Sequence, residues 1–199
     1  MSTRWRNHLL LLLVTTLAVL ATLAWQRWTA APIAEARQQW QERQWLAVLP
    51  PGSYDNRPLA AALSLEHPTL AHSRLLAGYR ASLAGNPVAI LLHSRCQGYG
   101  GPIDLAIAID RQGRLIGVQV LAQQESPGLG DQLVNPAVHW LEQFIGQTRT
   151  QDWALKRDHG AFDQLAGATV TSRAVIDALQ DALRYFDEHR PALLGEVAP

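Results

Sequence analysis

Residues 103–121 read IDLAIAIDRQGRLIGVQVL, and this stretch decides the fold class. Two runs rich in apolar and β-branched residues, 103–110 and 115–121, flank the polar tetrapeptide RQGR at residues 111–114. A short polar link with a glycine between two such runs is typical of a β-hairpin. We therefore predict two adjacent strands here.

The last part of the chain predicts a helix over residues 173–188. Its apolar residues recur at helical spacing and form one face, while Asp177 and Asp181 fall among the polar residues on the rest of the surface. Strands together with a segregated helix predict an α+β fold. The apolar face consists of Val175, Ile176, Leu179, Ala182, Leu183 and Phe186.

Weaker patterns predict the remaining elements. Before the hairpin, the sequence indicates a short helix at residues 59–65, a strand at 74–83 and a buried strand at 88–92. After it, residues 138–145 have helical spacing and 152–155 resemble the start of a strand. Cys96 is the one cysteine, so no intrachain disulfide can form, and a buried hydrophobic role fits it best.

Near the N-terminus the sequence predicts a membrane anchor. Arg4 and Arg6 are the only charged residues before Arg27, and residues 7–26 form an uncharged stretch whose length, about 30 Å as a helix, matches a bilayer. The leading positive charges favour a cytoplasmic N-terminus and export of the rest. The alternative is a cleaved signal peptide with its cleavage site at residues 29–31.

The expected organisation has three parts. Residues 1–28 form the cytoplasmic N-terminus and transmembrane anchor, and residues 29–87 form a juxtamembrane helix (35–49) and the beginning of an extracytoplasmic domain. Residues 88–199 form the main domain. The helix at 35–49 either faces a partner or packs on its own domain, and the second reading is slightly favoured.

Composition excludes several functions. The net charge is zero, with 17 basic and 17 acidic residues, which argues against nucleic-acid binding. The seven histidines have no metal-ligand spacing, so no metal site is expected, and no nucleophile–base pattern or catalytic residue is recognised. Any redox chemistry must therefore come from a cofactor.

The strongest candidate for a binding site is DQLAGATVTS, residues 163–172, just before the final helix. Its small residues Ala166, Gly167 and Ala168 allow another molecule to approach the backbone. Thr171 or Ser172 can cap the helix, whose free N–H groups can receive a phosphate. The alternative is a helix cap with no ligand.

The first seven of these residues, DQLAGAT, resemble the flavinylation motif Asp-x-x-Ser/Thr-Gly-Ala-Thr. That motif belongs to the FMN-binding domains of the G subunit of the bacterial Rnf electron-transport complex and of the C subunit of the sodium-pumping NADH:quinone reductase. The resemblance implies that Thr169 carries FMN as a phosphoester, attached by a flavin transferase that uses FAD. It also implies that Asp163 serves transferase recognition. Ala166 departs from the motif, which has a hydroxyl residue there.

Two further blocks resemble the same family. GYGGPID at residues 98–104 is similar to the start of the flavin domain in the Rnf protein, and ESPGLG at 125–130 is similar to a loop beside the flavin ring. Pro127 and Gly128 would form a turn against the ring, and Leu129 would supply an apolar contact. Cofactor contacts are also expected from Glu125 or Ser126 at the pyrimidine edge and from Lys156 as a positive charge near it. Tyr99 is expected in packing rather than in ring stacking.

Taken together, the resemblance implies a membrane-anchored electron carrier with covalent FMN, not a complete enzyme alone. In that family the complex transfers electrons between ferredoxin and NAD and couples this to ion movement. The implied partners are other membrane and iron–sulfur subunits, the flavin transferase and the bilayer. The implied location is the bacterial inner membrane, with a periplasmic main domain. Two alternatives are a stand-alone extracytoplasmic flavin carrier and a scaffold protein of the same complex without flavin.

Overall fold

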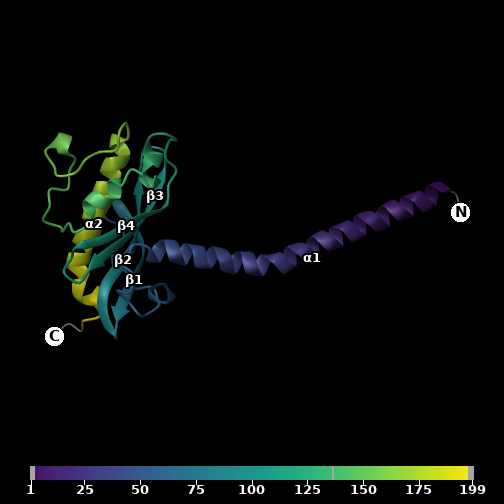
Figure 1. Cartoon of the computed structure of the whole chain (residues 1–199), viewed down its shortest axis with the longest axis horizontal. Helices are drawn as coiled ribbons and strands as arrows, with labels where there is room; N and C mark the ends of the chain where they lie inside the picture. The colour runs from purple at the N-terminus through teal and green to yellow at the C-terminus, as the bar shows by residue number, and fades with distance from the viewer. Residues whose placement is uncertain (1–2, 136, 197–199) are drawn as a thin grey trace. The chain divides into compact units, whose positions relative to one another are not determined.

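A computed structural model describes residues 3–135 and 137–196 (Figure 1). The chain divides into two compact units, residues 1–43 and 44–199, and each is described by itself. The structure contains both helix and sheet, which confirms the predicted α+β class. The helices and strands, with four short 3₁₀ segments, are α1 (Thr3–Leu46), η1 (Pro58–Ala60), β1 (Ser73–Leu83), β2 (Asn86–Gln97), β3 (Pro102–Asp110), β4 (Leu115–Ala122), η2 (Gly130–Val134), η3 (Trp140–Phe144), η4 (Lys156–Asp158) and α2 (Thr169–Leu194).

The first unit consists of the N-terminal part of α1. Within it, Leu11–Thr29 is a 19-residue segment with mean hydropathy 1.4, long and apolar enough to cross a membrane. Its threonines are compatible with an apolar medium because their hydroxyls donate to backbone carbonyls of the preceding turn, as Thr16 Oγ1 does to Leu12 O at 2.7 Å. The sequence predicted separate helices at 7–26 and 35–49, and this is wrong: α1 continues through Pro32 and ends at Leu46.

The second unit is built on a four-stranded antiparallel sheet with the order β1-β2-β3-β4. The predicted hairpin at residues 103–121 is confirmed as β3 and β4, with Ile107 opposite Val118. Gly113 in the turn has φ 85°, a conformation that glycine adopts without a steric penalty. The predicted strands at 74–83 and 88–92 are also confirmed, and the second extends over the whole of β2.

Both faces of the sheet are covered because side chains alternate along each strand. In β3, the residues at 103, 105, 107 and 109 join a large core that includes Phe186 of α2. Figure 1 shows α2 running alongside the sheet. Ala106 and Ala108 point to the other face, into a second cluster with Val48. The segment after α1 therefore covers the face that α2 leaves open.

The final helix is longer than predicted. Its expected apolar face is confirmed as buried, but α2 begins at Thr169 and continues past residue 188 to Leu194, with a kink at His189 two residues before Pro191. Asp181 was placed on the polar surface, and this is wrong. Its side chain is buried and accepts hydrogen bonds from His72 N (2.8 Å) and Ser73 Oγ (3.1 Å), which compensate for burial.

Three short elements differ from their predictions. The helix expected at 59–65 is only the 3₁₀ turn η1, since Leu63 N instead donates to Gly78 O of β1 at 2.8 Å. The helix expected at 138–145 is the 3₁₀ segment η3. The strand expected at 152–155 amounts to one isolated bridge between Leu155 and Phe162. In the first and third of these segments, backbone pairing with Gly78 and Phe162 takes the place of a regular helix or strand.

Candidate functional site

A cavity of about 330 Å³ lies between the loop after β4 and the start of α2. The loop contributes Glu125, Ser126, Leu129 and Gly130, and Tyr99 comes from the turn between β2 and β3. The cavity thus joins three segments that the sequence analysis singled out separately. The other lining residues are Gly167, Ala168, Thr169, Val170 and Thr171.

The start of α2 leaves its first N–H groups available. Thr169 is the first helical residue, and the preceding Ala168 supplies no side-chain cap. The predicted capping by Thr171 or Ser172 is wrong, because both residues lie inside the first turn. Ser172 Oγ instead accepts from Leu165 N and donates to Ala168 O, both at 2.9 Å. Uncapped N–H groups at a helix N-terminus favour a bound anion.

Two threonine hydroxyls line the cavity and differ in their contacts. Thr171 is 1% exposed, and its Oγ1 donates to Glu125 Oε2 at 2.7 Å. Thr169 is half-buried, and its Oγ1 has only a long contact of 3.3 Å with Gln164 Oε1. The Thr169 hydroxyl is therefore the more available of the two for chemistry.

Glu125 connects the loop after β4 to α2 and to the turn between β2 and β3. Its side chain is 8% exposed, and its Oε1 also accepts from Gly100 N at 3.3 Å. Neighbouring glycines make room for this carboxylate, since a Cβ built on Gly130 would collide with Glu125 Oε2. Its carboxylate is thus held by the protein itself, which leaves Ser126, half-buried in the same wall, as the freer polar side chain.

Five of the predicted site residues do not line this cavity within the part of the chain that the structure describes. Ala166 and the turn residues Pro127 and Gly128 lie beside it rather than in its wall. Lys156 Nζ and Asp163 Oδ2 form an exposed ion pair at 2.6 Å. The positive charge expected at a flavin edge therefore neutralises the motif's acidic residue in this structure.

Sequence reasoning gave Tyr99 a different role and did not single out Val170. Tyr99 was expected to pack, but its side chain is 72% exposed and lines the cavity. Val170, also on the cavity wall, is 51% exposed. The signal was present in the sequence, because Tyr99 lies within the block 98–104 that carries the family resemblance. Its exposure was not foreseeable from a turn rich in glycine.

Burial raises the pKa of two titratable side chains, Asp177 and Cys96. Asp177 lies on α2 in a neighbouring cavity of about 310 Å³ that shares Val170 with the first, and burial raises the pKa of its carboxyl. Burial also raises the pKa of the Cys96 thiol to about 12. That thiol is 4% exposed, which confirms the predicted hydrophobic role and leaves it protonated at neutral pH.

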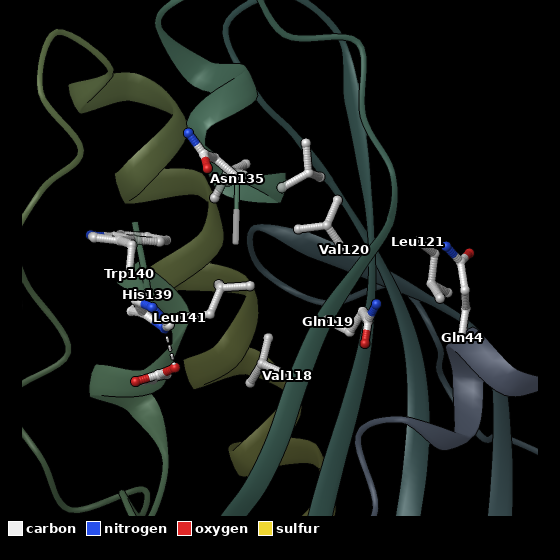
Figure 2. A pocket seen from close by; sticks show the side chains of 12 residues that line it. Gln44, Val118, Gln119, Val120, Leu121, Asn135, His139, Trp140 and Leu141 are labelled. Atoms are coloured by element: carbon white, nitrogen blue, oxygen red, sulfur yellow. Dashed lines mark hydrogen bonds and ion pairs between the residues drawn. The ribbon is translucent and has the colours of Figure 1, made fainter. Parts of the chain in front are cut away.

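A larger cavity of about 590 Å³ lies between β4 and the segments η2 and η3 (Figure 2). None of the predicted cofactor residues lines it within the described ranges. Its wall is connected to the DQLAGAT segment, residues 163–169, because Trp140 Nε1 donates to Asp163 O at 2.7 Å. The lining residues are Gln44, Val118, Gln119, Val120, Leu121, Leu133, Val134, Asn135, His139, Trp140, Leu141 and Glu142.

Comparison with known proteins identifies relatives over nearly the whole chain. Residues 98–184 match the family described as FMN-binding domain. A Pseudomonas aeruginosa (strain UCBPP-PA14) protein, named as the G subunit of an ion-translocating oxidoreductase complex, is 43% identical over 200 residues, which cover 96% of this chain and 92% of the relative. The protein of the same name from Vibrio cholerae serotype O1 (strain M66-2) is 38% identical, and the alignment covers 86% of each.

Among solved structures, the crystal structure of Shewanella oneidensis NqrC is similar to this chain with a TM-score of 0.46 and 21% sequence identity. The aligned part covers 57% of this chain and 60% of that one.

Proposed function

The chain belongs to the family of G subunits of ion-translocating oxidoreductase complexes, and from that premise we propose that it carries FMN covalently on Thr169. As a member of this family it is an electron transport component of a multi-subunit complex. In the proposal, the cavity at the start of α2 holds the flavin, and the FMN phosphate is esterified to the Thr169 hydroxyl.

The residues around the cavity fit this cofactor. Its volume of about 330 Å³ is within the range of small-molecule sites, roughly 300–1,000 Å³. The exposed side chains of Tyr99 and Leu129 offer apolar surface that a planar ring can cover. Ser126 offers a hydroxyl, and Gly130 and Gly167 keep the wall free of further side chains.

The single observation that carries the proposal is the position of Thr169. Its available hydroxyl stands at the uncapped N-terminus of α2 and in the cavity wall. A phosphate attached there is close to the N–H groups of the first turn and to the positive end of the helix dipole. Ala166, the departure from the motif, is exposed outside the cavity lining, so its methyl group removes no cavity contact.

The attachment step is a phosphoryl transfer catalysed by a flavin transferase. The Thr169 oxygen forms a bond to the FMN phosphorus of FAD, and the bond between that phosphorus and the bridging oxygen breaks. AMP leaves with the bridging oxygen, and the hydroxyl proton is released. Asp163 serves recognition by the transferase in this proposal, and Lys156 pairs with it before the enzyme binds.

When bound, FMN supplies reversible electron uptake and release, while the chain supplies attachment and orientation. We propose that the electrons pass between ferredoxin and NAD through other membrane and iron–sulfur subunits, coupled to ion movement. The proposed location is the bacterial inner membrane, with Leu11–Thr29 as the single span, the N-terminus in the cytoplasm and residues 44–199 in the periplasm. The charges of Arg4 and Arg6 support this orientation.

The test is co-expression of the full chain with a flavin transferase, followed by denaturation, in-gel flavin fluorescence and intact-mass analysis. We expect the wild type to fluoresce and to gain the mass of one FMN less water. Thr169→Val should lose both signals, because it keeps the side-chain shape and removes the acceptor oxygen. An unmodified wild type, beside a known substrate labelled in the same cells, would contradict the proposal and favour a scaffold protein without flavin.

A further inference from the structure

The backbone of Asp163, the first residue of the flavinylation motif, is held by the side chain of Gln143. Asp163 N donates to Gln143 Oε1 at 2.8 Å, and Gln143 Nε2 donates back to Asp163 O at 3.2 Å. One amide side chain thus satisfies both backbone groups of a residue twenty positions away. This pairing fixes the orientation of the Asp163 peptide as well as its position.

Trp140 adds a third hydrogen bond to the same residue. Its indole Nε1 donates to Asp163 O at 2.7 Å, so this carbonyl accepts from two side chains of η3. Figure 2 shows the indole nitrogen turned away from Val118 and Val120, the valines on the opposite wall of the larger cavity. Trp140 therefore reaches from that cavity to the motif.

The segment η3 is itself firmly anchored. Phe144, one residue after Gln143, is fully buried, and its ring lies 4.8 Å from that of Phe162 and 5.0 Å from that of Trp140. Trp153 stacks on Phe144 at 6.1 Å. Aromatic groups packed in this way leave Gln143 little freedom to move relative to the core.

A second anchor holds the middle of the motif. Leu165 is buried, and its N–H donates to Ser172 Oγ of α2 at 2.9 Å. The motif is therefore attached to η3 at Asp163 and to α2 at Leu165. The backbone that carries the Asp163 carboxylate and the Thr169 hydroxyl is consequently ordered before any enzyme binds.

We propose that Gln143 and Trp140 are positioning residues for FMN attachment: they preorganise the 163–169 segment for the flavin transferase. This inference rests on the proposed function, because it concerns attachment at Thr169. An acceptor segment that is already ordered loses less conformational freedom when the transferase binds it. The effect belongs to acceptor binding, so it appears mainly in KM for the chain.

The test measures FMN transfer from FAD to the full chain in detergent, with purified transferase and varied chain concentration. Gln143→Met removes both hydrogen bonds and preserves length, and Gln143→Glu keeps only the acceptor for Asp163 N. We expect kcat/KM to fall about tenfold for Gln143→Met, chiefly through KM, and less for Gln143→Glu. Trp140→Phe, which keeps the ring contacts and loses the N–H, should shift KM in the same direction.

Gln151→Met is the matched control, because Gln151 is exposed in a turn, where its backbone N–H donates to Thr148 O. It should transfer FMN at the wild-type rate. The melting temperature of each unmodified variant separates positioning from folding. For Gln143→Met we expect a decrease of only about 3 °C, because the freed N–H of Asp163 can reach water and its carbonyl keeps the hydrogen bond from Trp140.

Three outcomes would overturn the inference. Wild-type kinetics for Gln143→Met would show that the hydrogen bonds between Gln143 and Asp163 do not act on attachment. A fall in kcat/KM that is equal for the Met and Glu variants and follows the melting temperature would show a purely structural role. A wild-type chain that is never labelled, beside a labelled known substrate, would instead reject the proposed function, and the inference with it.

Discussion

Gly167 lines the cavity and Gly128 belongs to the neighbouring loop, and both adopt positive φ, 73° and 79°. An added side chain would meet different surroundings at the two positions. A Cβ on Gly167 would lie 2.8 Å from Leu129 Cδ2, whereas a Cβ on Gly128 would have nothing within 4 Å. An alanine at either position would therefore incur the conformational cost of positive φ. Only at Gly167 would its Cβ also collide with Leu129.

We therefore expect Gly167→Ala to lower both stability and FMN incorporation. The left-handed conformation costs an alanine about 1 kcal/mol, and displacement of Leu129 adds to that cost. Chemical denaturation gives the free energy of unfolding, and in-gel fluorescence gives the flavin content. Gly128→Ala is the control: it should lose about 1 kcal/mol and keep its flavin. Equal flavin loss in both variants would contradict a specific role for the contact between residues 167 and 129.

At the scale of elements, the loop at residues 125–130 and helix α2 are joined by one buried hydrogen bond. Thr171 Oγ1 donates to Glu125 Oε2, and both side chains are almost completely buried. A buried carboxylate that loses a donor pays a desolvation penalty, since water cannot replace the missing partner. The bond therefore holds the two walls of the cavity together.

Thr171→Val should destabilise the protein by about 1–3 kcal/mol, because it keeps the shape of the side chain and removes the donor. The proposed acceptor, Thr169, remains, so the part of the chain that folds should still receive FMN there. Thr169→Val provides the opposite pattern: the half-buried hydroxyl has only a long contact, so stability should barely change while flavin is lost. Urea denaturation and mass analysis of both variants measure the two effects. FMN found on Thr171 would contradict this assignment.

At the scale of the whole molecule, a long apolar helix and a compact folded unit belong to one chain. Residues 44–199 contain the sheet, α2 and the cavity, whereas Leu11–Thr29 has the length and hydropathy of a membrane span. The proposed function requires the compact unit outside the cytoplasm. The leading arginines are the sequence feature that would set this orientation.

A reporter enzyme that is active only outside the cytoplasm, fused to the C-terminus, should therefore be active with the full chain. The same fusion lacking residues 1–28 should be inactive, because the segment that directs export is gone. Cell fractionation should place the full fusion with the membranes, which distinguishes a retained anchor from a cleaved signal. Activity of a reporter that works only in the cytoplasm would contradict the orientation.

The sequence by itself determined the elements with a regular period and the family. The hairpin at 103–121 follows from two β-rich runs around a polar link with a glycine. Helix α2 follows from helical spacing, because that pattern reports burial on one face. The family resemblance drawn from residues 98–104, 125–130 and 163–169 is confirmed by relatives at 34% to 43% identity. Its motifs are contiguous, so they are visible without a structure. The roles of the individual site residues stay predictions.

Only the tertiary structure decided which of those residues meet. Tyr99, Glu125 and Thr169 share one cavity, while Lys156 lies outside its lining and pairs with Asp163. The hydrogen bonds of Thr171 with Glu125 and of Gln143 with Asp163 join positions 46 and 20 residues apart. No local period encodes such contacts, because irregular segments satisfy their polar groups with whatever the fold brings near. The sequence therefore specified the parts and the family, and the packing of loops on α2 and η3 specified the site.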